Sequence, residues 1–395
     1  MVMPGTDMKI AETPKEGLQD YKKVDAYEAW LKKEGVKVYE DFYFPSLAKI
    51  ELGPWERKGG KGAVIHIANR RMSNDCHVVE IRPGGNSEPE HHMYELTIYV
   101  VSGRGATTIW QDEQDEQDEK DEQQKRSFEW HAGSLFSIPL NAWYQNFNGS
   151  GNEPTRYIAV TNAPPMMRLF KDSDFIFNCD FRFRSRYSGE EDYFSGNGKL
   201  FNRRIWESNF IANAPDMRLY GWKERGAGGI NAMLEMAENN VKSHISEFPI
   251  GTYKKAHRHG PGAHLVLLSG TGGFSLIWTK EDRSDMIKCD WQLGSMVTVP
   301  SDNCFHQHFN TGINRARYLA LRPGDMGLNS PHGGGGEYAD RSIKEGGWQI
   351  EYEDEEREIH KIFEKDLAAH GAPCRMKAFV PWCTGEVGPT SERDT

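Results

Sequence analysis

The chain has 395 residues, with 48 Lys and Arg against 58 Asp and Glu, which gives a formal net charge of −10 at pH 7. This acidic balance argues against a nucleic-acid or anionic-membrane surface. The length suits two domains, and the 37 % hydrophobic and 11 % aromatic residues supply a sizeable core. The 40 Gly and 19 Pro are typical of an all-β protein with many turns.

The cysteines and the start of the chain indicate the compartment. Six Cys are scattered without a Cys-x-x-Cys pair, and a chain of this size does not need a disulfide framework. The first residues hold no apolar run of signal-peptide length, and no run approaches the roughly twenty residues of a membrane span. These features predict a soluble, cytoplasmic protein with no membrane partner.

The N-terminal region, residues 1–45, is predicted to be a helical arm. Apolar side chains recur at helical spacing in residues 15–34, and Gly35 ends the pattern. We interpret Trp30 as a packing residue. Short β-like runs separated by Gly, Asn and Pro follow, which is typical of a sandwich or barrel. The run at 112–122 holds eight acidic residues, and we interpret it as a solvated loop tip.

Landmarks of the first half recur in the same order in the second half. The matching pairs are Trp55 with Trp222, Trp110 with Trp278, Gly133 with Gly294, Asn148 with Asn310, and Arg156 with Arg317. This order predicts a tandem duplication of one β-domain. The predicted parts are the arm 1–45, a first barrel 46–165, a connector 166–210, a second barrel 211–325, and an extension 326–395. A helix is expected at 354–371, ended by Gly371.

Five of the fourteen His fall in two short segments of the second barrel. On a strand, His257 and His259 leave the same face, where two imidazoles can hold one metal ion. His306, in the second segment, is the natural third ligand. The alternative is a polar, hydrated strand end on which His residues cluster without a metal.

Together with the duplication, these segments resemble the cupin superfamily, specifically the bicupins. Residues that match the first cupin motif are Gly251, His257, His259 and Gly270, and those that match the second are Gly294, Pro300, His306 and Asn310. The resemblance covers both barrels. It implies an all-β fold of two tandem cupin domains, which are jelly-roll β-barrels, with N-terminal and C-terminal helical extensions. The motifs are specific for the fold and weak for the reaction.

The His-Arg-His segment is similar to that of the gentisate, salicylate and hydroxynaphthoate ring-cleaving dioxygenases, which carry Ala at the cupin Glu position. Here Ala263 falls near that position and His264 follows it. The resemblance implies Fe(II) on three histidines, while the departure at the Glu position leaves His264 as an alternative fourth ligand. The three are His257, His259 and His306. By the same match, His308 handles a proton beside the metal.

The substrate implied by this site is an anionic organic acid. A neutral imidazole face leaves Fe(II) with a net positive charge and open positions for substrate and O₂, while Mn, Ni and Zn stay open as alternatives. Leu265 stands where those dioxygenases place a carboxylate-binding Arg. Arg322, at the end of a strand that should border the pocket, is the substrate-binding candidate. Arg317 recurs as Arg156, which favours a structural role for both.

The first barrel is the degenerate copy. When the two copies are aligned, Glu90 and His92 fall at the positions of the His-Arg-His histidines, and Tyr144 falls at the position of His306. With Glu95 nearby, these side chains are a weak second metal candidate. The alternative is a structural barrel or a dimer face.

These features predict a metal-dependent bicupin oxygenase, an Fe(II) dioxygenase that cleaves a hydroxylated aromatic or enol-like acid. Its partners would be a small organic acid and O₂, and it would be a homo-oligomer. One alternative is a metal-dependent decarboxylase, isomerase or lyase that uses the ion as a Lewis acid. Another is a non-catalytic bicupin that binds a small molecule. The retention of a full His set in only one barrel favours an enzyme.

Overall fold

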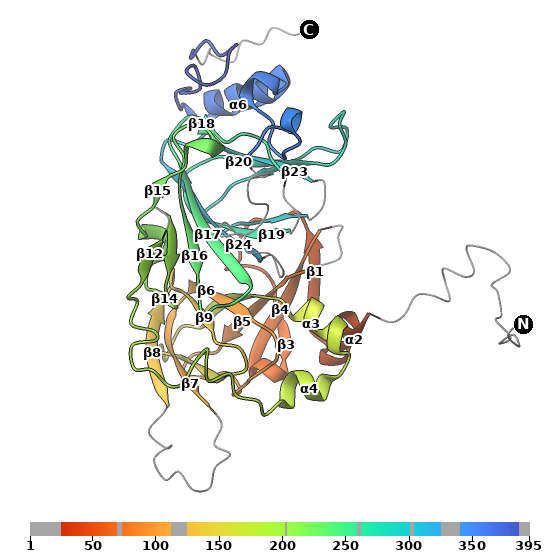
Figure 1. Cartoon of the computed structure of the whole chain (residues 1–395), viewed down its shortest axis with the longest axis vertical. Helices are drawn as coiled ribbons and strands as arrows, with labels where there is room; N and C mark the ends of the chain where they lie inside the picture. Colours follow the sequence, from red (N-terminus) through yellow and green to blue (C-terminus); the bar gives the residue numbers. More distant parts are fainter. Residues whose placement is uncertain are drawn as a thin grey trace, which may run out of the picture.

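The computed structural model describes residues 25–68, 73–111, 125–201, 204–258, 262–300, 304–324 and 340–386. The acidic run, the beginning of the predicted N-terminal helix, and His259 lie outside these residues. The chain forms two β-barrels stacked along the long axis of the molecule, with helices beside the first barrel and beyond the second (Figure 1). The predicted all-β fold of two tandem barrels with helical extensions is confirmed.

The first barrel consists of two facing sheets. Its strands are β1 (Lys37–Asp41), β3 (Gly53–Trp55), β4 (Gly60–Ile67), β5 (Asp75–Ile81), β6 (Leu96–Ser102), β7 (Arg104–Trp110), β8 (Arg126–His131), β9 (Leu135–Ile138), β10 (Trp143–Asn148) and β11 (Thr155–Thr161). The larger sheet runs β1-β4-β5-β11-β6-β9, and the smaller runs β10-β7-β8. Alternate residues of β5 face opposite ways, so that Val79 packs inside the barrel and Val78 packs toward the second domain.

The second barrel repeats this plan. Its strands are β12 (Lys199–Phe201), β13 (Ile205–Glu207), β15 (Tyr220–Gly221), β16 (Ile230–Glu235), β17 (Val241–Phe248), β18 (Thr252–Tyr253), β19 (Ala263–Ser269), β20 (Phe274–Trp278), β21 (Ile287–Asp290), β22 (Met296–Val299), β23 (Phe305–Asn310) and β24 (Ala316–Pro323). The larger sheet runs β12-β13-β16-β17-β24-β19-β22, and the smaller runs β18-β23-β20-β21.

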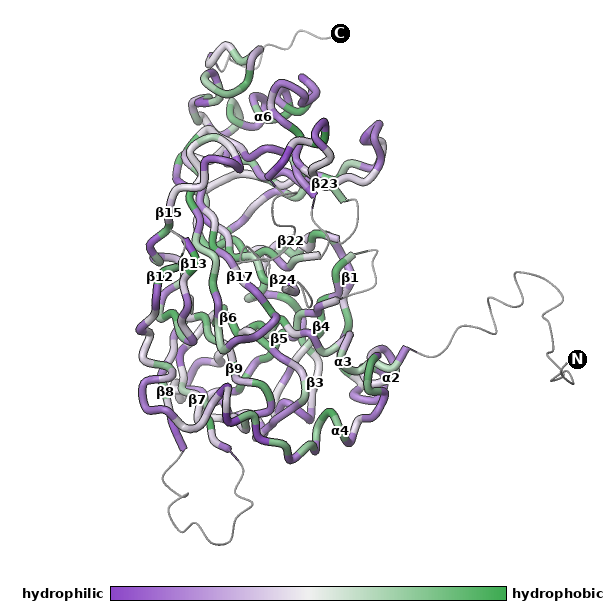
Figure 2. The backbone as a smooth tube through the Cα atoms, viewed as in Figure 1, coloured by the Kyte–Doolittle hydropathy of each residue, from purple (hydrophilic) through white to green (hydrophobic). Residues whose placement is uncertain are grey.

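The two larger sheets pack face to face and exchange an edge strand. β2 (Tyr43–Phe44), which precedes the first barrel, pairs with β22 of the second, whereas β14 (Phe210–Ile211), from the end of the connector, pairs with β9 of the first. One continuous apolar core lies between the sheets, and it includes Val78, Ile158, Ile245 and Leu319. The strands that meet there carry hydrophobic segments in Figure 2. Each exchanged strand covers an edge that would otherwise lack a partner.

The N-terminal helix is α2 (Ala26–Glu34), which begins after Asp25 and ends at Gly35 in the left-handed conformation. The Asp25 side chain accepts hydrogen bonds from two backbone N–H groups of the first turn. Trp30 is 5 % exposed and packs in the core of the first barrel. The predicted packing role of Trp30 is therefore confirmed.

The C-terminal helix is α6 (Arg357–His370), and Gly371 ends it with φ 66°. Its buried face, with Ile359, Phe363 and Leu367, packs in one apolar core with residues of β18, β20 and β23. The predicted helix and its Gly stop are both confirmed. Short 3₁₀ turns precede it at Ile343–Glu345 and Tyr352–Asp354.

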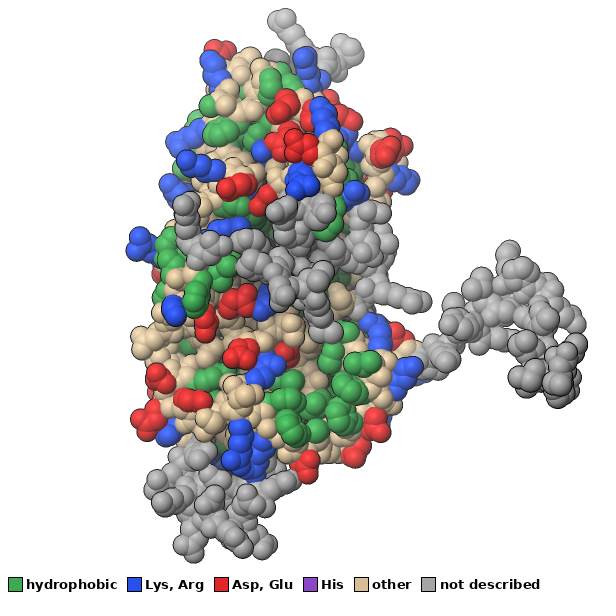
Figure 3. All heavy atoms as spheres, in the orientation of Figure 1, with side chains coloured by type: hydrophobic (Ala, Val, Ile, Leu, Met, Phe, Trp, Pro, Cys, Tyr) green, Lys and Arg blue, Asp and Glu red, His purple; other side chains and the backbone are tan. Residues whose placement is uncertain are grey.

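Two helices that the sequence pattern did not indicate lie where the chain leaves the first barrel, α3 (Ala163–Phe170) and α4 (Ser173–Asn178). Apolar side chains gather on the surface near α2, α3 and α4 in Figure 3, and among them Leu169 is 66 % exposed. Homo-oligomer formation stays a prediction. In the described part of the chain, no helix is long and apolar enough to cross a membrane.

Candidate metal centre

Two of the predicted ligands, His257 and His306, lie side by side inside the second barrel. The N–H of each donates to the carbonyl of the other, with N···O distances of 3.0 and 2.8 Å, and the ring centroids are 4.2 Å apart. Both side chains are buried, at 5 % and 3 % exposure. The predicted third ligand, His259, lies outside the described residues.

Hydrogen bonds fix the tautomers of these two rings. Nδ1 of His257 lies 3.1 Å from the carbonyl of Lys255, and Nδ1 of His306 lies 3.5 Å from the carbonyl of Cys304. A carbonyl only accepts, so each of these contacts requires a proton on Nδ1. Burial in the first place, and then nearby Arg225 and Lys254, lower the pKa of His306 to about 3, so this ring is neutral at physiological pH.

His308 occupies the same face of β23 as His306. Its ring centroid is 5.4 Å from that of His306 and 6.3 Å from that of His257. Nδ1 of His308 lies 2.8 Å from the Ser275 hydroxyl, which itself accepts from the indole N–H of Trp291. A hydroxyl can either donate or accept, so this contact leaves His308 able to exchange its proton. The geometry suits the predicted proton-handling role.

A buried lysine, which sequence reasoning missed, lies close to these histidines. Lys254 is 3 % exposed, its backbone N–H donates to the carbonyl of His308, and its Nζ donates to the Tyr318 hydroxyl at 3.1 Å. The Nζ atom lies 4.6 Å from the ring centroid of Phe248 and 5.3 Å from that of Trp222. Burial, with two neighbouring guanidinium groups, lowers the pKa of this amine well below its usual value.

Trp222 lies among three cations. The guanidinium of Arg204 is 4.3 Å from its ring centroid and that of Arg225 is 4.8 Å away, in addition to Lys254. Arg225 is 5 % exposed and forms a 3.1 Å ion pair with Asp340. The guanidinium groups of Arg204 and Arg225, with the Lys254 amine beside them, make this part of the barrel attractive to an anion. The duplication could have indicated Arg225, because it stands three residues after Trp222, as Lys58 stands three residues after Trp55 in the first copy.

The structure does not bring His264 to the histidine pair. Its Nε2 lies 3.0 Å from the carbonyl of Ile65, and its Nδ1 lies 3.1 Å from the amide nitrogen of Asn74. Successive residues of a strand face opposite sides. Leu265 packs in the core inside the barrel, so His264 faces the first domain. The expected fourth ligand is therefore corrected to a contact between the domains.

Arg322, the predicted substrate-binding residue, lies on the same face of β24 as Tyr318, because the two residues are four apart along the strand. It is 5 % exposed. Its role toward a substrate stays a prediction. Arg156 and Arg317 each form an ion pair with a glutamate on a neighbouring strand, which fits their expected structural role.

The predicted correspondence between the barrels holds in the backbone. Glu90 pairs with Tyr144 through the same kind of isolated bridge that joins His257 and His306. However, the Glu90 carboxylate accepts two hydrogen bonds from Lys58 Nζ, at 2.8 and 2.6 Å. His92 contacts the Tyr94 carbonyl through Nδ1 and the Tyr144 hydroxyl through Nε2, at 2.7 and 3.2 Å. The Glu90 carboxylate is thus already paired with a buried lysine ammonium.

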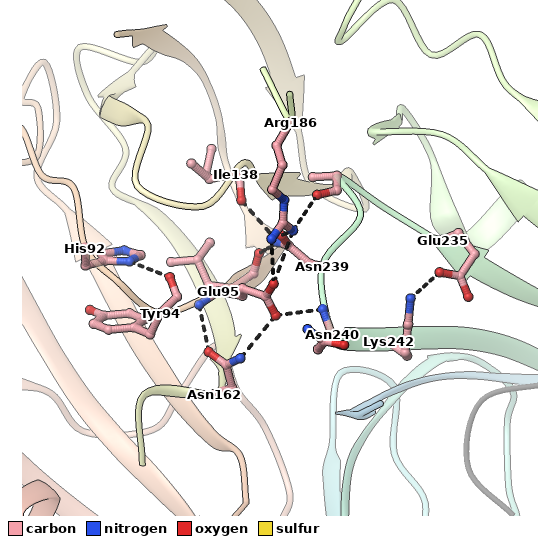
Figure 4. Close-up of polar contacts among 12 residues, drawn as sticks. His92, Tyr94, Glu95, Ile138, Asn162, Arg186, Glu235, Asn239, Asn240 and Lys242 are labelled. Atoms are coloured by element: carbon pink, nitrogen blue, oxygen red, sulfur yellow. Dashed lines mark hydrogen bonds and ion pairs between the residues drawn. The ribbon is translucent and has the colours of Figure 1, made fainter. Parts of the chain in front are cut away.

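Glu95, the remaining metal-ligand candidate of the first barrel, is held in a network of polar contacts (Figure 4). It forms a 3.1 Å ion pair with Arg186 of the connector, and it accepts from the side chain of Asn162 and from the backbone N–H of Asn240 in the second domain. These contacts join the connector to both domains. The carboxylate points into this network, and the weak second metal candidate therefore loses its acidic ligands to other partners.

The donors of the second barrel fit a divalent metal ion. His257 and His306 each have Nδ1 facing a backbone carbonyl, the kind of outer contact that orients metal-binding histidines. Neutral imidazoles suit Fe, Mn, Ni and Zn alike, so the donor type does not choose among them.

Comparisons with known proteins give only weak similarities. No family model matches the chain, and no curated protein matches it. Among solved structures, a Lactobacillus farciminis oxalate decarboxylase in complex with formate has a TM-score of 0.45 at 13 % identity, over 72 % of this chain and 86 % of that chain. The Bacillus subtilis oxalate decarboxylase, in a study of its Mn(II) centres, has a TM-score of 0.45 at 15 % identity, over 73 % and 78 % of the two chains. Similarities at this level carry no argument about activity.

Proposed function

We propose that the second barrel is a metal-dependent enzyme centre that converts a small organic acid by proton transfer, as a decarboxylase, isomerase or lyase does. The observation that carries this proposal is the buried pair of His257 and His306, each with Nδ1 facing a backbone carbonyl, beside the buried amine of Lys254. His259 would complete the ligand set. A divalent ion bound there supplies a Lewis acid that polarises a bound carboxylate or carbonyl oxygen.

Lys254 and Arg225 are the residues proposed to bind the acid. Both are buried, so the charge of Arg225, and that of Lys254 once an acid is bound, acts through a region shielded from solvent, where electrostatic attraction is strong. A substrate carboxylate would compensate the charge of Lys254 and favour its ammonium form. The aromatic rings of Trp222, Phe248 and Tyr318 keep water from the same space.

Two hydrogen-bonded groups are placed to move protons. His308 shares a hydrogen bond with Ser275, and the Lys254 amine donates to the Tyr318 hydroxyl. Decarboxylation and lyase reactions leave a carbanion-like centre that needs a proton, and a general acid must lie within hydrogen-bond reach of it. We assign this role to His308 and the charge-balancing role to Lys254.

An Fe(II) dioxygenase is the second candidate function, and one observation favours it. Ala263, near the cupin Glu position, packs among apolar side chains, so this position supplies no carboxylate to the metal. A neutral set of histidines is also what the resemblance to ring-cleaving dioxygenases implies. The two functions differ in their need for O₂.

Turnover with and without O₂ separates the candidates. Protein loaded anaerobically with Fe(II), Mn(II), Ni(II) or Zn(II) would be incubated with aliphatic oxo-acids, hydroxy-acids and hydroxylated aromatic acids. We expect product without O₂, measured as released CO₂ or as an isomerised acid by mass spectrometry. Product that appears only with Fe(II) and O₂, with matching O₂ uptake, would establish the dioxygenase instead. Binding without conversion under both conditions would indicate a non-catalytic protein.

Replacing Lys254 with methionine is expected to stabilise the protein and impair turnover. Because burial lowers its folded-state pKa, the unfolded chain binds more protons than the folded chain below the usual lysine pKa. Wild-type stability therefore rises with pH across that window, and K254M lacks this rise. At neutral pH we expect a gain of about 0.5–2 kcal/mol. Chemical unfolding at pH 6 and pH 9, with KM measured alongside, checks both effects. Equal pH slopes in the two proteins would refute the charge argument.

A further inference from the structure

Outside the barrels, four potential metal ligands meet where α6 contacts the chain that follows it. They are His360 and Glu364 of α6, and Cys374 and Cys383 of the C-terminal segment. One ligand atom from each residue lies within 4.8 Å of the other three. The two cysteines and His360 are buried, at 9 %, 7 % and 2 % exposure.

The distances between these atoms match a tetrahedral site. Metal–ligand bonds of about 2.0–2.3 Å place neighbouring ligand atoms of a tetrahedron roughly 3.3–3.8 Å apart. The Sγ atoms of Cys374 and Cys383 are 3.4 Å apart, and Nε2 of His360 lies 3.2 Å from Oε1 of Glu364. In a tetrahedral site these two pairs would be opposite edges, and the other distances among the four atoms are all within 4.8 Å. The sulfur atoms are well beyond the disulfide bond length of about 2.05 Å.

The partners of His360 direct its lone pair into the cluster. Tyr253 donates its hydroxyl hydrogen to Glu355, at 2.7 Å, so its oxygen accepts from Nδ1 of His360, at 3.0 Å. Nε2 then carries the lone pair, and it has no hydrogen-bond partner although it lies close to Glu364. A lone pair facing a carboxylate oxygen is unfavourable unless a cation lies between them. The outer hydrogen bond of His360 is the type that supports metal-binding histidines.

We propose that these four side chains form a structural zinc site. Two thiolates select a softer ion such as Zn²⁺ over Mn²⁺ or Mg²⁺, and four protein ligands close the site to substrate. Glu364 is half-buried, and it gives the ion a path from solvent. The site is separate from the proposed catalytic centre and does not depend on it.

The zinc site would fasten a segment that lacks regular structure. Residues 372–386 contain no helix or strand, yet Cys374, Met376 and Val380 pack in the core under α6. The N–H of Arg375 donates to the carbonyl of Gly251 at 2.9 Å, directly before β18. A metal that joins this segment to α6 therefore holds both against the outer face of the smaller sheet.

Metal content and sulfur ligation test the proposal. The protein would be purified with reduced thiols, and H257A would be used so that the barrel ligands do not contribute. We expect about one zinc per chain, with an absorption fine structure that shows two sulfur neighbours at about 2.3 Å. C383S should lose this zinc in the same background. The matched control C179S alters a cysteine outside the cluster and should retain it.

Three outcomes would overturn the site. One is zinc without sulfur neighbours, another is zinc that persists unchanged in C383S, and the third is an intact mass that shows a Cys374–Cys383 disulfide and no bound metal. If C383S does not fold, the sulfur shell measured on H257A, in which all four ligands are intact, still decides the question.

Discussion

Replacement of His257 by alanine is expected to remove one metal ion per chain and to lower kcat/KM by more than about 100-fold. Loss of a group that only orients a ligand already costs roughly 10–100-fold, and His257 is a proposed ligand itself. Only two of the three proposed imidazoles, those of His306 and His259, would then remain for the ion, one fewer than the three protein ligands of a typical open metal site. Metal analysis of the purified protein and steady-state kinetics on the substrate found in the panel measure the two effects.

H92A is the matched control for this experiment, because His92 occupies the corresponding region of the first barrel and contacts Tyr144 as His257 contacts His306. It should keep its full metal content and its turnover. Loss of metal in H92A with retention in H257A would move the centre to the first barrel. The zinc proposed at the C-terminal cluster should remain in both variants. The expected result is therefore a difference of one metal ion per chain between H257A and H92A, and not the complete loss of metal.

Replacement of Lys58 by methionine is expected to destabilise the protein by about 3–5 kcal/mol, because the substitution leaves a buried carboxylate without its cation. Lys58 is 2 % exposed and Glu90 is 8 % exposed, and both carboxylate oxygens bind the ammonium. The double variant K58M/E90Q removes both charges and should recover most of the loss. Unfolding in guanidinium chloride, followed by fluorescence of the tryptophans, measures the difference.

K37M serves as the control, because Lys37 pairs with Glu51 at the surface, where its partner is 81 % exposed. Its unfolding midpoint should not move, since exposed ion pairs contribute little. The interpretation of the first barrel fails if K58M unfolds like the wild type, or if the double variant is as unstable as the single one.

The tandem duplication made much of this architecture predictable. Matching landmarks aligned Glu90 with His257 and Tyr144 with His306. In the structure, equivalent backbone bridges join Glu90 to Tyr144 and His257 to His306. The helix at the C-terminus was readable from its spacing and its Gly stop. Local patterns of this kind survive because each barrel must bury its own strands.

What the sequence concealed depends on contacts between distant segments. Whether His264 points into the barrel depends on which face of β19 lines the barrel interior. Both faces of β19 are buried, so its sequence shows no alternation of apolar and polar residues that would reveal the inner face. Lys254 reads as one of two adjacent lysines, and only the fold buries one of them. The C-terminal ligand cluster joins a helix to a segment without a periodic pattern, so no spacing rule indicated it.

The exchange of β2 and β14 has a consequence for the history of the chain. Each half of the molecule lends the other an edge strand, so deletion of either half would expose an unpaired strand edge and the broad apolar face between the sheets. A duplicated copy that has lost its metal ligands would therefore still have to keep its fold. We expect the first barrel, in which Lys58 binds the Glu90 carboxylate, to be an obligatory folding partner of the second.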